Sequence, residues 1–86
     1  MIKLSICIPT FNRVHFLENC LNSIAIASQN STLKYEVCIS DNFSEEKILP
    51  VIDKYNQKIN IILNRNESNI GLGANILKSV SLASGD

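Results

Sequence analysis

The chain has 86 residues, a formal net charge of zero, 45% hydrophobic and 19% charged residues. This size and composition are typical of one small globular domain. The balanced charge argues against nucleic acid or an anionic membrane surface as a partner. No apolar run reaches the roughly 18 residues of a membrane-spanning helix, and the first residues show no signal-peptide pattern. We therefore expect a cytoplasmic protein.

The three cysteines, Cys7, Cys20 and Cys38, are an odd number and form no CxxC pair. Cys7 and Cys38 lie in predicted strands, and Cys20 lies on the apolar side of a predicted helix. We expect buried free thiols in a reducing compartment. His15, the one histidine of the sequence, lies on a different element, so these residues do not predict a metal site.

The first predicted element is a strand over residues 3–9. Its apolar run, Leu4 to Ile8, is typical of a strand covered on both faces, as in parallel sheets flanked by helices. Pro9 has no N–H to donate and is expected to end the strand. A helix follows over residues 14–28, with Asn12 as a plausible N-cap and apolar residues at three- and four-residue steps.

Further strands are predicted over residues 35–40 and 59–63, and further helices over residues 48–56 and 72–84. Pro50 places the start of the second helix near Ile48, because proline is tolerated in a first turn. The third helix is expected to bury Leu72, Ile76, Val80 and Ala83, with Leu77 beside them, and to end at Gly85 in the C′ position.

The order β-α-β-α-β-α predicts an α/β fold. Parallel strands with right-handed crossovers give a three-layer, Rossmann-like sheet of order 3-2-1 with helices on both faces. The first strand is then an apolar free edge, from which we expect self-association. The loops at the carboxyl ends of the strands, residues 9–13, 41–44 and 64–75, line the crevice where such folds bind ligands. The loop at residues 29–34 lies at the other end of the sheet.

Asp41 directly follows a buried strand, and its carboxylate is expected to point into the crevice, where it would accept hydrogen bonds from a nucleobase or a ribose. Alternatively, Asp41 forms an Asx-turn that caps the next segment. Arg13 and Arg65 would neutralise a diphosphate or lie solvated on the surface. Asn66, Asn69 and Asn75 would stabilise the third loop, and Asn75 is the best ligand candidate among them.

Gly71-Leu72-Gly73 opens the third helix, where glycines let the backbone approach a phosphate. The pattern is incomplete as a dinucleotide fingerprint, because Ile76 stands where a third glycine is needed, and the lysine of a P-loop is missing. The alternative is a pair of ordinary loop glycines. The residues assemble no Ser/His/Asp set, Cys/His pair or metal-ligand cluster, so no catalytic or metal-binding residue is predicted.

Four motifs in register resemble the inverting family 2 glycosyltransferases, which have the GT-A fold. They are ICIPTFNR at residues 6–13, VCISDNFS at residues 37–44, Asn69-Ile70-Gly71 with Asn75, and ASGD at residues 83–86. Within the family, the PTFNR start and the SDN variant look most similar to bacterial O-antigen and lipopolysaccharide sugar transferases.

The resemblance implies a site for a nucleotide-diphosphate sugar in the amino-terminal part of a glycosyltransferase domain, spanning residues 1–86. Asp41 matches the acidic residue that hydrogen-bonds the base, while Ser40 stands where many relatives have a first acidic residue. Arg13 and the loop from Asn69 to Asn75 would lie near the ribose and diphosphate. The implied nucleotide-binding residues are Pro9, Thr10, Phe11, Asn12, Arg13, Asp41, Asn42, Asn69, Gly71, Gly73 and Asn75.

In the family, a strand ending in the DxD metal motif follows a pair like Gly85-Asp86. The Mg²⁺ or Mn²⁺ ligands and the general base would therefore lie beyond residue 86, and the chain alone is expected to be inactive. The parent enzyme would act on a glycan or lipid-linked acceptor, in the cytoplasm or at the inner face of the membrane. The alternative is a stand-alone nucleotide-binding module without transferase chemistry; a third interpretation is a structural fragment with an empty crevice.

Overall fold

The computed structural model describes residues 2–29 and 31–85, so Asn30 of the first long loop and Asp86 of the closing ASGD motif lie outside the described residues. In chain order the described elements are β1 (Leu4–Thr10), α1 (Val14–Ala27), β2 (Tyr35–Asp41), α2 (Leu49–Tyr55), β3 (Ile61–Arg65) and α3 (Leu72–Ser81). Strand β1 continues through Pro9 to Thr10, β3 begins at Ile61 rather than at Ile59, and α3 ends at Ser81 rather than at Ser84.

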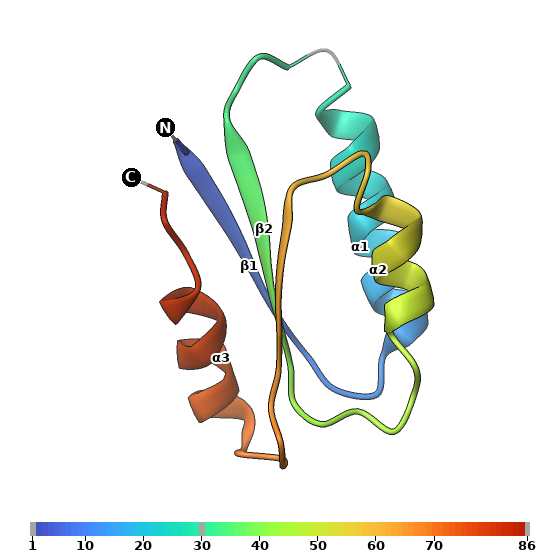
Figure 1. The fold of residues 1–86 in the computed structure, drawn as a ribbon, viewed down its shortest axis with the longest axis vertical. Helices are drawn as coiled ribbons and strands as arrows, with labels where there is room; N and C mark the ends of the chain where they lie inside the picture. Colours follow the sequence, from blue (N-terminus) through green and yellow to red (C-terminus); the bar gives the residue numbers. More distant parts are fainter. Residues whose placement is uncertain (1, 30, 86) are drawn as a thin grey trace.

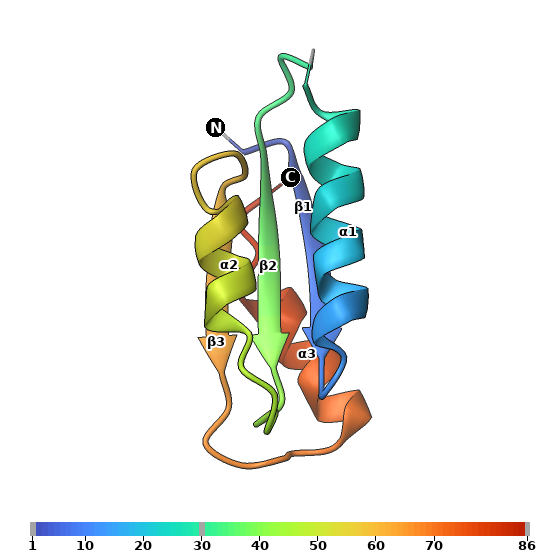
Figure 2. The ribbon, with the colours of Figure 1, turned by 90° about the vertical axis from the view of Figure 1, so that its right-hand side faces the viewer.

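The strands form a parallel sheet of order β1-β2-β3, which confirms the predicted order read from the other edge. Helices α1 and α2 cover one face, and α3 covers the other (Figures 1 and 2). Thr10 pairs with Asp41, and Asp41 pairs with Arg65, so the three strand tips are level. Among the described residues, no helix has the length and apolar character needed to cross a membrane.

The apolar core lies between the sheet and the pair α1 and α2. The apolar stripe predicted for α1 is confirmed, because Leu17 and Leu21 are buried there against β2, and Ile52 of α2 is buried in the same core. The proline tolerated at the start of α2 is in its first turn, as expected. The core residues are Leu17, Leu21, Val37, Ile39, Ile48, Val51, Ile52, Tyr55 and Ile59.

The opposite face, beneath α3, is polar, and the predicted apolar face of α3 is wrong. Asn75 and Ser79 are the buried residues of this helix, whereas Leu72 and Leu77 are 75% and 71% exposed. Ile76 and Val80 are also exposed, and so is Ala83 beyond the helix, while β2 presents Glu36, Cys38 and Ser40 to this side. Helical periodicity located an apolar stripe but gave no information about which side of the helix meets the sheet.

Both predicted helix caps are also wrong. Arg13, not Asn12, is the N-cap of α1, because the Asn12 side chain is engaged with another loop and its φ is 50°. Leu82 is the C-cap of α3, and Gly85 lies past the cap, where its N–H donates to Ser5 Oγ at 2.8 Å. We call Ser84 and Gly85 the C-terminal strap, since they lie against the amino ends of β1 and β2.

The cysteines are free thiols, as expected. Cys38 is fully buried, whereas Cys7 and Cys20 are half-buried. Burial, followed by the nearby Glu36 carboxylate, raises the pKa of the Cys38 thiol to about 12. Cys38 is therefore a neutral packing residue at physiological pH.

Candidate functional site: a cavity at the strand tips

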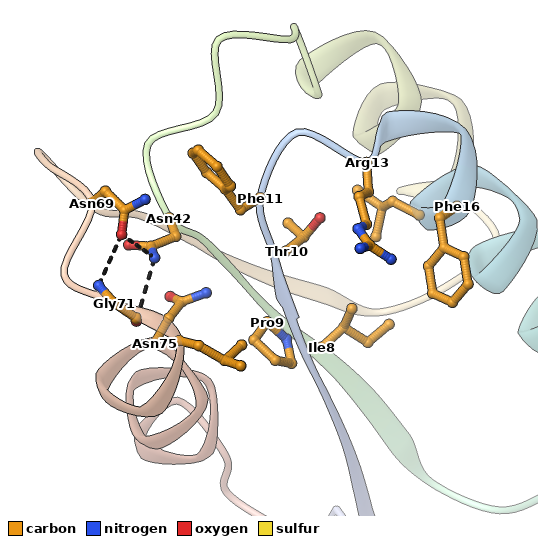
Figure 3. A pocket seen from close by; sticks show the side chains of 12 residues that line it. Ile8, Pro9, Thr10, Phe11, Arg13, Phe16, Asn42, Asn69, Gly71 and Asn75 are labelled. Carbon is orange, nitrogen blue, oxygen red and sulfur yellow. Dashed lines mark hydrogen bonds between the residues drawn. The ribbon is translucent and has the colours of Figure 1, made fainter.

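A cavity of about 630 Å³ lies at the carboxyl end of β1, between α1 and α3 (Figure 3). Asn12, Asp41 and Gly73 were predicted site residues but do not line it. Ile8, Phe16, Leu17 and Leu72 line it and were not predicted. The complete lining is Ile8, Pro9, Thr10, Phe11, Arg13, Phe16, Leu17, Asn42, Asn69, Gly71, Leu72 and Asn75.

The β1 side of the cavity is formed where the edge strand turns into α1. Pro9 is tolerated within the strand because it lies on a free edge, where a missing N–H breaks no ladder. Thr10 is nearly buried, and its carbonyl accepts the Asn42 N–H at 2.8 Å, which ties the first strand tip to the second. Phe11, 42% exposed, and Phe16, 62% exposed, place aromatic rings at the cavity, and Arg13 lies between these positions in sequence.

The opposite wall is held by an asparagine cluster, which we define as Asn42, Asn64, Asn66, Asn69 and Asn75. The Asn75 side chain accepts Ser40 Oγ at 2.8 Å and Asn66 Nδ2 at 2.9 Å, and donates to the Ser40 carbonyl at 3.0 Å. Asn64 Nδ2 donates to Ser40 Oγ at 3.1 Å. These bonds fix the first turn of α3 on the tips of β2 and β3 (Figure 1).

Asn42 connects the cluster to the loop before α3. Its Nδ2 donates to Asn69 Oδ1 at 2.9 Å (Figure 3). Its Oδ1 accepts the Ile70 N–H at 2.9 Å. The Gly71 N–H donates to Asn69 Oδ1 at 2.8 Å, so this amide is already satisfied within the protein. Gly71 has φ 89°, which explains a glycine at this position. The described buried side-chain polar atoms all have partners, so the wall is pre-organised.

The expectation that the Asp41 carboxylate points into the crevice is not met in this structure. Asp41 is fully buried and accepts the Ser44 hydroxyl and the Ser44 N–H, while Arg65 Nε lies 3.3 Å away. Because side chains alternate along a strand, Asp41 is directed to the same face as Val37 and Ile39. The turn-forming alternative fits these contacts. A contact with a nucleobase stays a prediction and would require the carboxylate to leave Ser44.

Arg65 and Asn12 hold the loop after β2 from outside the cavity. Arg65 donates to the Ser44 carbonyl at 3.0 Å and lies 5.0 Å from the centre of the Phe43 ring, so it does not face a diphosphate in the cavity. Asn12 Oδ1 accepts the Glu45 N–H at 2.8 Å, and the Asn12 N–H donates to Ser44 Oγ at 2.8 Å. Both residues therefore hold the loop after β2 in place without lining the cavity themselves.

The lining chemistry suits binding rather than catalysis. Arg13 is the cationic residue among the described lining residues, which include no carboxylate or histidine that could act as a general base. Within the described ranges, no three His, Cys, Asp or Glu side chains lie close enough to hold a metal ion. These residues thus do not fit the divalent cation that the family resemblance implies, and we derive no step through it.

A second hollow of about 540 Å³ lies on the other side of the loop after β2, between residues 44–50 and β3. Its lining includes Arg65, Leu63 and the exposed Glu45 and Glu46. Apart from Arg65, which was considered as a diphosphate ligand, it contains none of the residues implied to bind the nucleotide, and it provides an internal reference for ligand-binding experiments.

A parallel sheet with helices on both faces, and a cavity at the carboxyl ends of its strands, defines the Rossmann-like class of nucleotide-binding folds. Residues 5–86 match the family model "Glycosyl transferase family 2". The chain therefore belongs to glycosyltransferase family 2.

The chain is similar to several named transferases. It is 46% identical over 85 residues to abequosyltransferase RfbV of Salmonella typhimurium, covering 96% of this chain and 25% of RfbV. It is 32% identical over 71 residues to poly(ribitol-phosphate) beta-N-acetylglucosaminyltransferase TarS of Staphylococcus aureus, covering 83% of this chain and 12% of TarS. The chain thus spans a quarter or less of the length of these relatives.

Solved structures agree with this assignment. The crystal structure of S. aureus TarS 1-349 in complex with UDP superposes with a TM-score of 0.83 at 29% identity, covering 98% of this chain and 25% of that chain. The mannosyltransferase PcManGT from Pyrobaculum calidifontis in complex with GDP-Man and Mn²⁺ superposes with a TM-score of 0.77 at 17% identity. The superposition covers 95% of this chain and 24% of PcManGT. The latter likeness shows a shared fold.

Proposed function

We propose that this chain forms the nucleotide-binding part of a glycosyltransferase and that the cavity between α1 and α3 receives the nucleotide of a sugar donor. The observation that supports this most is the position of the cavity at the strand tips of a fold that superposes on TarS bound to UDP. Further TarS structures include one in complex with UDP-GlcNAc. The donor class is therefore a nucleoside-diphosphate sugar.

The lining gives each part of such a ligand a chemical partner. Arg13 pairs with the diphosphate, since a guanidinium binds phosphate oxygens bidentately. The exposed ring of Phe11 offers an apolar surface to the base, and Thr10 a hydroxyl to the ribose. We propose as nucleotide-binding residues Pro9, Thr10, Phe11, Arg13, Asn42, Asn69, Gly71 and Asn75, supported by Asn12, Asp41 and Gly73 from positions outside the lining.

For the whole enzyme we propose transfer of a sugar, with inversion, to a bacterial polysaccharide or lipid-linked acceptor, as in O-antigen or lipopolysaccharide synthesis. The likeness to RfbV supports this placement. Mg²⁺ or Mn²⁺ would be held by residues beyond 86, and the bound cation would neutralise the negative charge of the donor diphosphate. Such an enzyme acts in the cytoplasm, at the inner face of the membrane.

Calorimetric titration with UDP tests the proposed function. We expect measurable binding to the wild-type chain and at least about tenfold weaker binding to Arg13→Ala, because a phosphate loses its charged partner. Lys47→Ala, which removes an exposed cation from the second hollow, is the matched control and keeps the wild-type affinity. Absence of binding to the wild type, or equal losses in both variants, would contradict the proposal.

We also propose that the free edge of β1 mediates self-association. Leu4 is 44% exposed, and β1 pairs with β2 along one side. Unpaired strand edges are templates for a second chain. Light scattering should show dimers or larger species at high concentration, and a monomer throughout the concentration range would refute this edge pairing.

A further inference from the structure

Helix α3 is held on the sheet by polar contacts instead of an apolar interface. Its buried residues, Asn75 at 2% and Ser79 at 0% exposure, are polar, while its large apolar side chains face outward. Ser79 Oγ donates within the helix, to the Ile76 carbonyl at 2.7 Å. The hydrophobic effect therefore contributes little to the docking of α3, and its position depends on hydrogen bonds at its two ends.

The amino end of α3 is bonded through Asn75 to Ser40 and Asn66, as described above. This end forms one wall of the cavity, since Gly71, Leu72 and Asn75 line it. The Asn75 N–H donates to the Gly71 carbonyl at 3.1 Å and closes the first helical turn. Protection of this amide thus reports on the integrity of the cavity wall.

The segment that follows the carboxyl end of α3 is held on the sheet by a buried carboxylate, that of Glu36, which is 3% exposed. Its Oε2 accepts the Ser84 N–H at 2.6 Å and Ser5 Oγ at 2.7 Å, and its Oε1 accepts Ser84 Oγ at 3.0 Å. Cys38 Sγ lies 3.6 Å from Oε2 as a weak donor. Glu36 thus joins the C-terminal strap to both β1 and β2.

Gly85 completes this arrangement by close approach to β1. Its N–H donates to Ser5 Oγ at 2.8 Å, so Ser5 relays the strap to Glu36. A Cβ at position 85 would lie 2.6 Å from Ser5 Oγ and 3.0 Å from the Ser5 backbone nitrogen. A side chain at this position would push the strap off the sheet.

We propose that Glu36 is a positioning residue for the cavity: it anchors the C-terminal strap to the sheet and thereby fixes the helix whose first turn forms one wall. The anchor itself is independent of any ligand. Its effect on nucleotide affinity rests on the proposed function.

The anchor requires the ionised carboxylate. The Ser84 N–H, followed by the Ser5 hydroxyl, lowers the pKa of Glu36 below its ordinary value of 4.5. The stabilisation is therefore present above pH 4.5 and is lost as the pH falls through the lowered pKa. The neighbouring Cys38 thiol has a pKa raised to about 12 and stays protonated across this window.

Amide hydrogen exchange followed by NMR, on wild type and Glu36→Gln, tests the anchor. We expect the protection factors of Ser84 and Gly85 to fall by at least about tenfold in the variant, because a charged acceptor is lost. The Asn75 amide should lose protection as well. The Val37 amide, bonded to the Asn60 carbonyl at 2.8 Å in the central strand, reports global unfolding and should change less. Asp53→Asn, an exposed carboxylate on α2, is the matched control.

Gly85→Ala perturbs the same strap without altering Glu36. It should reproduce the loss of protection at Ser84 and Asn75, at neutral pH. In the wild type, strap protection relative to Val37 should decrease as the pH falls from 4.5 through the lowered pKa of Glu36, whereas Glu36→Gln should show no such pH step. A uniform loss of protection at Ser84, Asn75 and Val37 would mean general destabilisation and would overturn the proposal. Lower protection of Ser84 and Gly85 with unchanged protection of the Asn75 amide would overturn the positioning role.

A UDP titration of the same variants adds the link to function. Glu36→Gln should bind UDP about threefold to tenfold more weakly than the wild type, as expected for a positioning residue outside the site. If the wild type does not bind UDP, the proposed function fails, while the exchange data still decide on the anchor. If both proteins bind UDP equally, Glu36 does not position the site.

Discussion

The two faces of the sheet are built on different physical principles. The face under α1 and α2 buries a continuous apolar cluster, whereas the face under α3 buries Glu36, Ser40 and Asn75 in hydrogen-bonded networks. Apolar burial is non-directional and tolerates small shifts, while a network of hydrogen bonds requires one arrangement. The first face gives the chain its stability, and the second gives the cavity wall a defined position.

The largest expected effect is in the apolar face. Leu21→Ala removes a fully buried side chain and leaves a hole in the core, so the free energy of unfolding should fall by about 3 kcal/mol. Leu77→Ala makes the same chemical change on α3, where the side chain is 71% exposed, and should cost less than about 0.5 kcal/mol. Urea unfolding followed by circular dichroism measures both free energies. Similar losses in the two variants would mean that the two faces of the sheet contribute to stability in the same way.

Removal of Asn75 should have the next largest effect. Asn75→Ala removes the acceptor of the Ser40 hydroxyl, one of the two acceptors of Asn66 Nδ2 and a donor to the Ser40 carbonyl, and should lower the free energy of unfolding by about 2 kcal/mol. Asn19→Ala on the exposed side of α1 is the control, and alanine there should be neutral or slightly stabilising. A neutral Asn75→Ala would mean that α3 does not depend on its polar contacts.

Asp41→Asn separates the two interpretations of this residue. If Asp41 holds the loop through Ser44 and Arg65, the free energy of unfolding should fall by about 1 kcal/mol without any ligand present. The figure is modest because Arg65 is about half exposed, which screens the ion pair. Glu45→Gln serves as an exposed control nearby. Unchanged stability together with lost UDP binding would favour a direct nucleobase contact instead.

The smallest effect is expected at the exposed ion pair of Glu18 and Lys54, whose atoms lie 2.8 Å apart. The hydrogen bond from Lys54 lowers the pKa of Glu18 below 4.5, so this contribution is present above pH 4.5 and fades as the pH falls through the lowered value. Because both side chains are solvated, Glu18→Gln should leave the melting temperature unchanged within error. A clear drop at pH 7 would show that surface charges stabilise the α1–α2 face.

The sequence predicted the fold and much of the cavity because those features follow from local patterns. Apolar runs that stop before Pro9 and Asp41 located the first two strands, and parallel pairing then brought the strand tips together. Phe16 and Leu17 were missed as lining residues, although their place in the first turn of α1 after Arg13 is a signal that could have found them. The orientation of α3 could not be predicted, because it depends on contacts between residues far apart in sequence, such as the bond from the Ser84 N–H to the Glu36 carboxylate.

Asp41 shows the same limit at the scale of one side chain. Its position at a strand end was correct, but the alternation of side chains directs its carboxylate toward Ser44 and Arg65. Asn42, one residue later, is the residue that lines the cavity. Which of Asp41 and Asn42 meets a ligand therefore depends on the direction of each side chain, and not on the location of the strand end.

An NMR titration of the wild-type chain with UDP tests whether the strand-tip cavity between α1 and α3 binds a nucleotide. We expect saturable amide shifts at Thr10, Phe11, Arg13 and Gly71, with the second hollow at residues 44–50 unaffected. No shifts at saturating UDP, or shifts confined to residues 44–50, would contradict it.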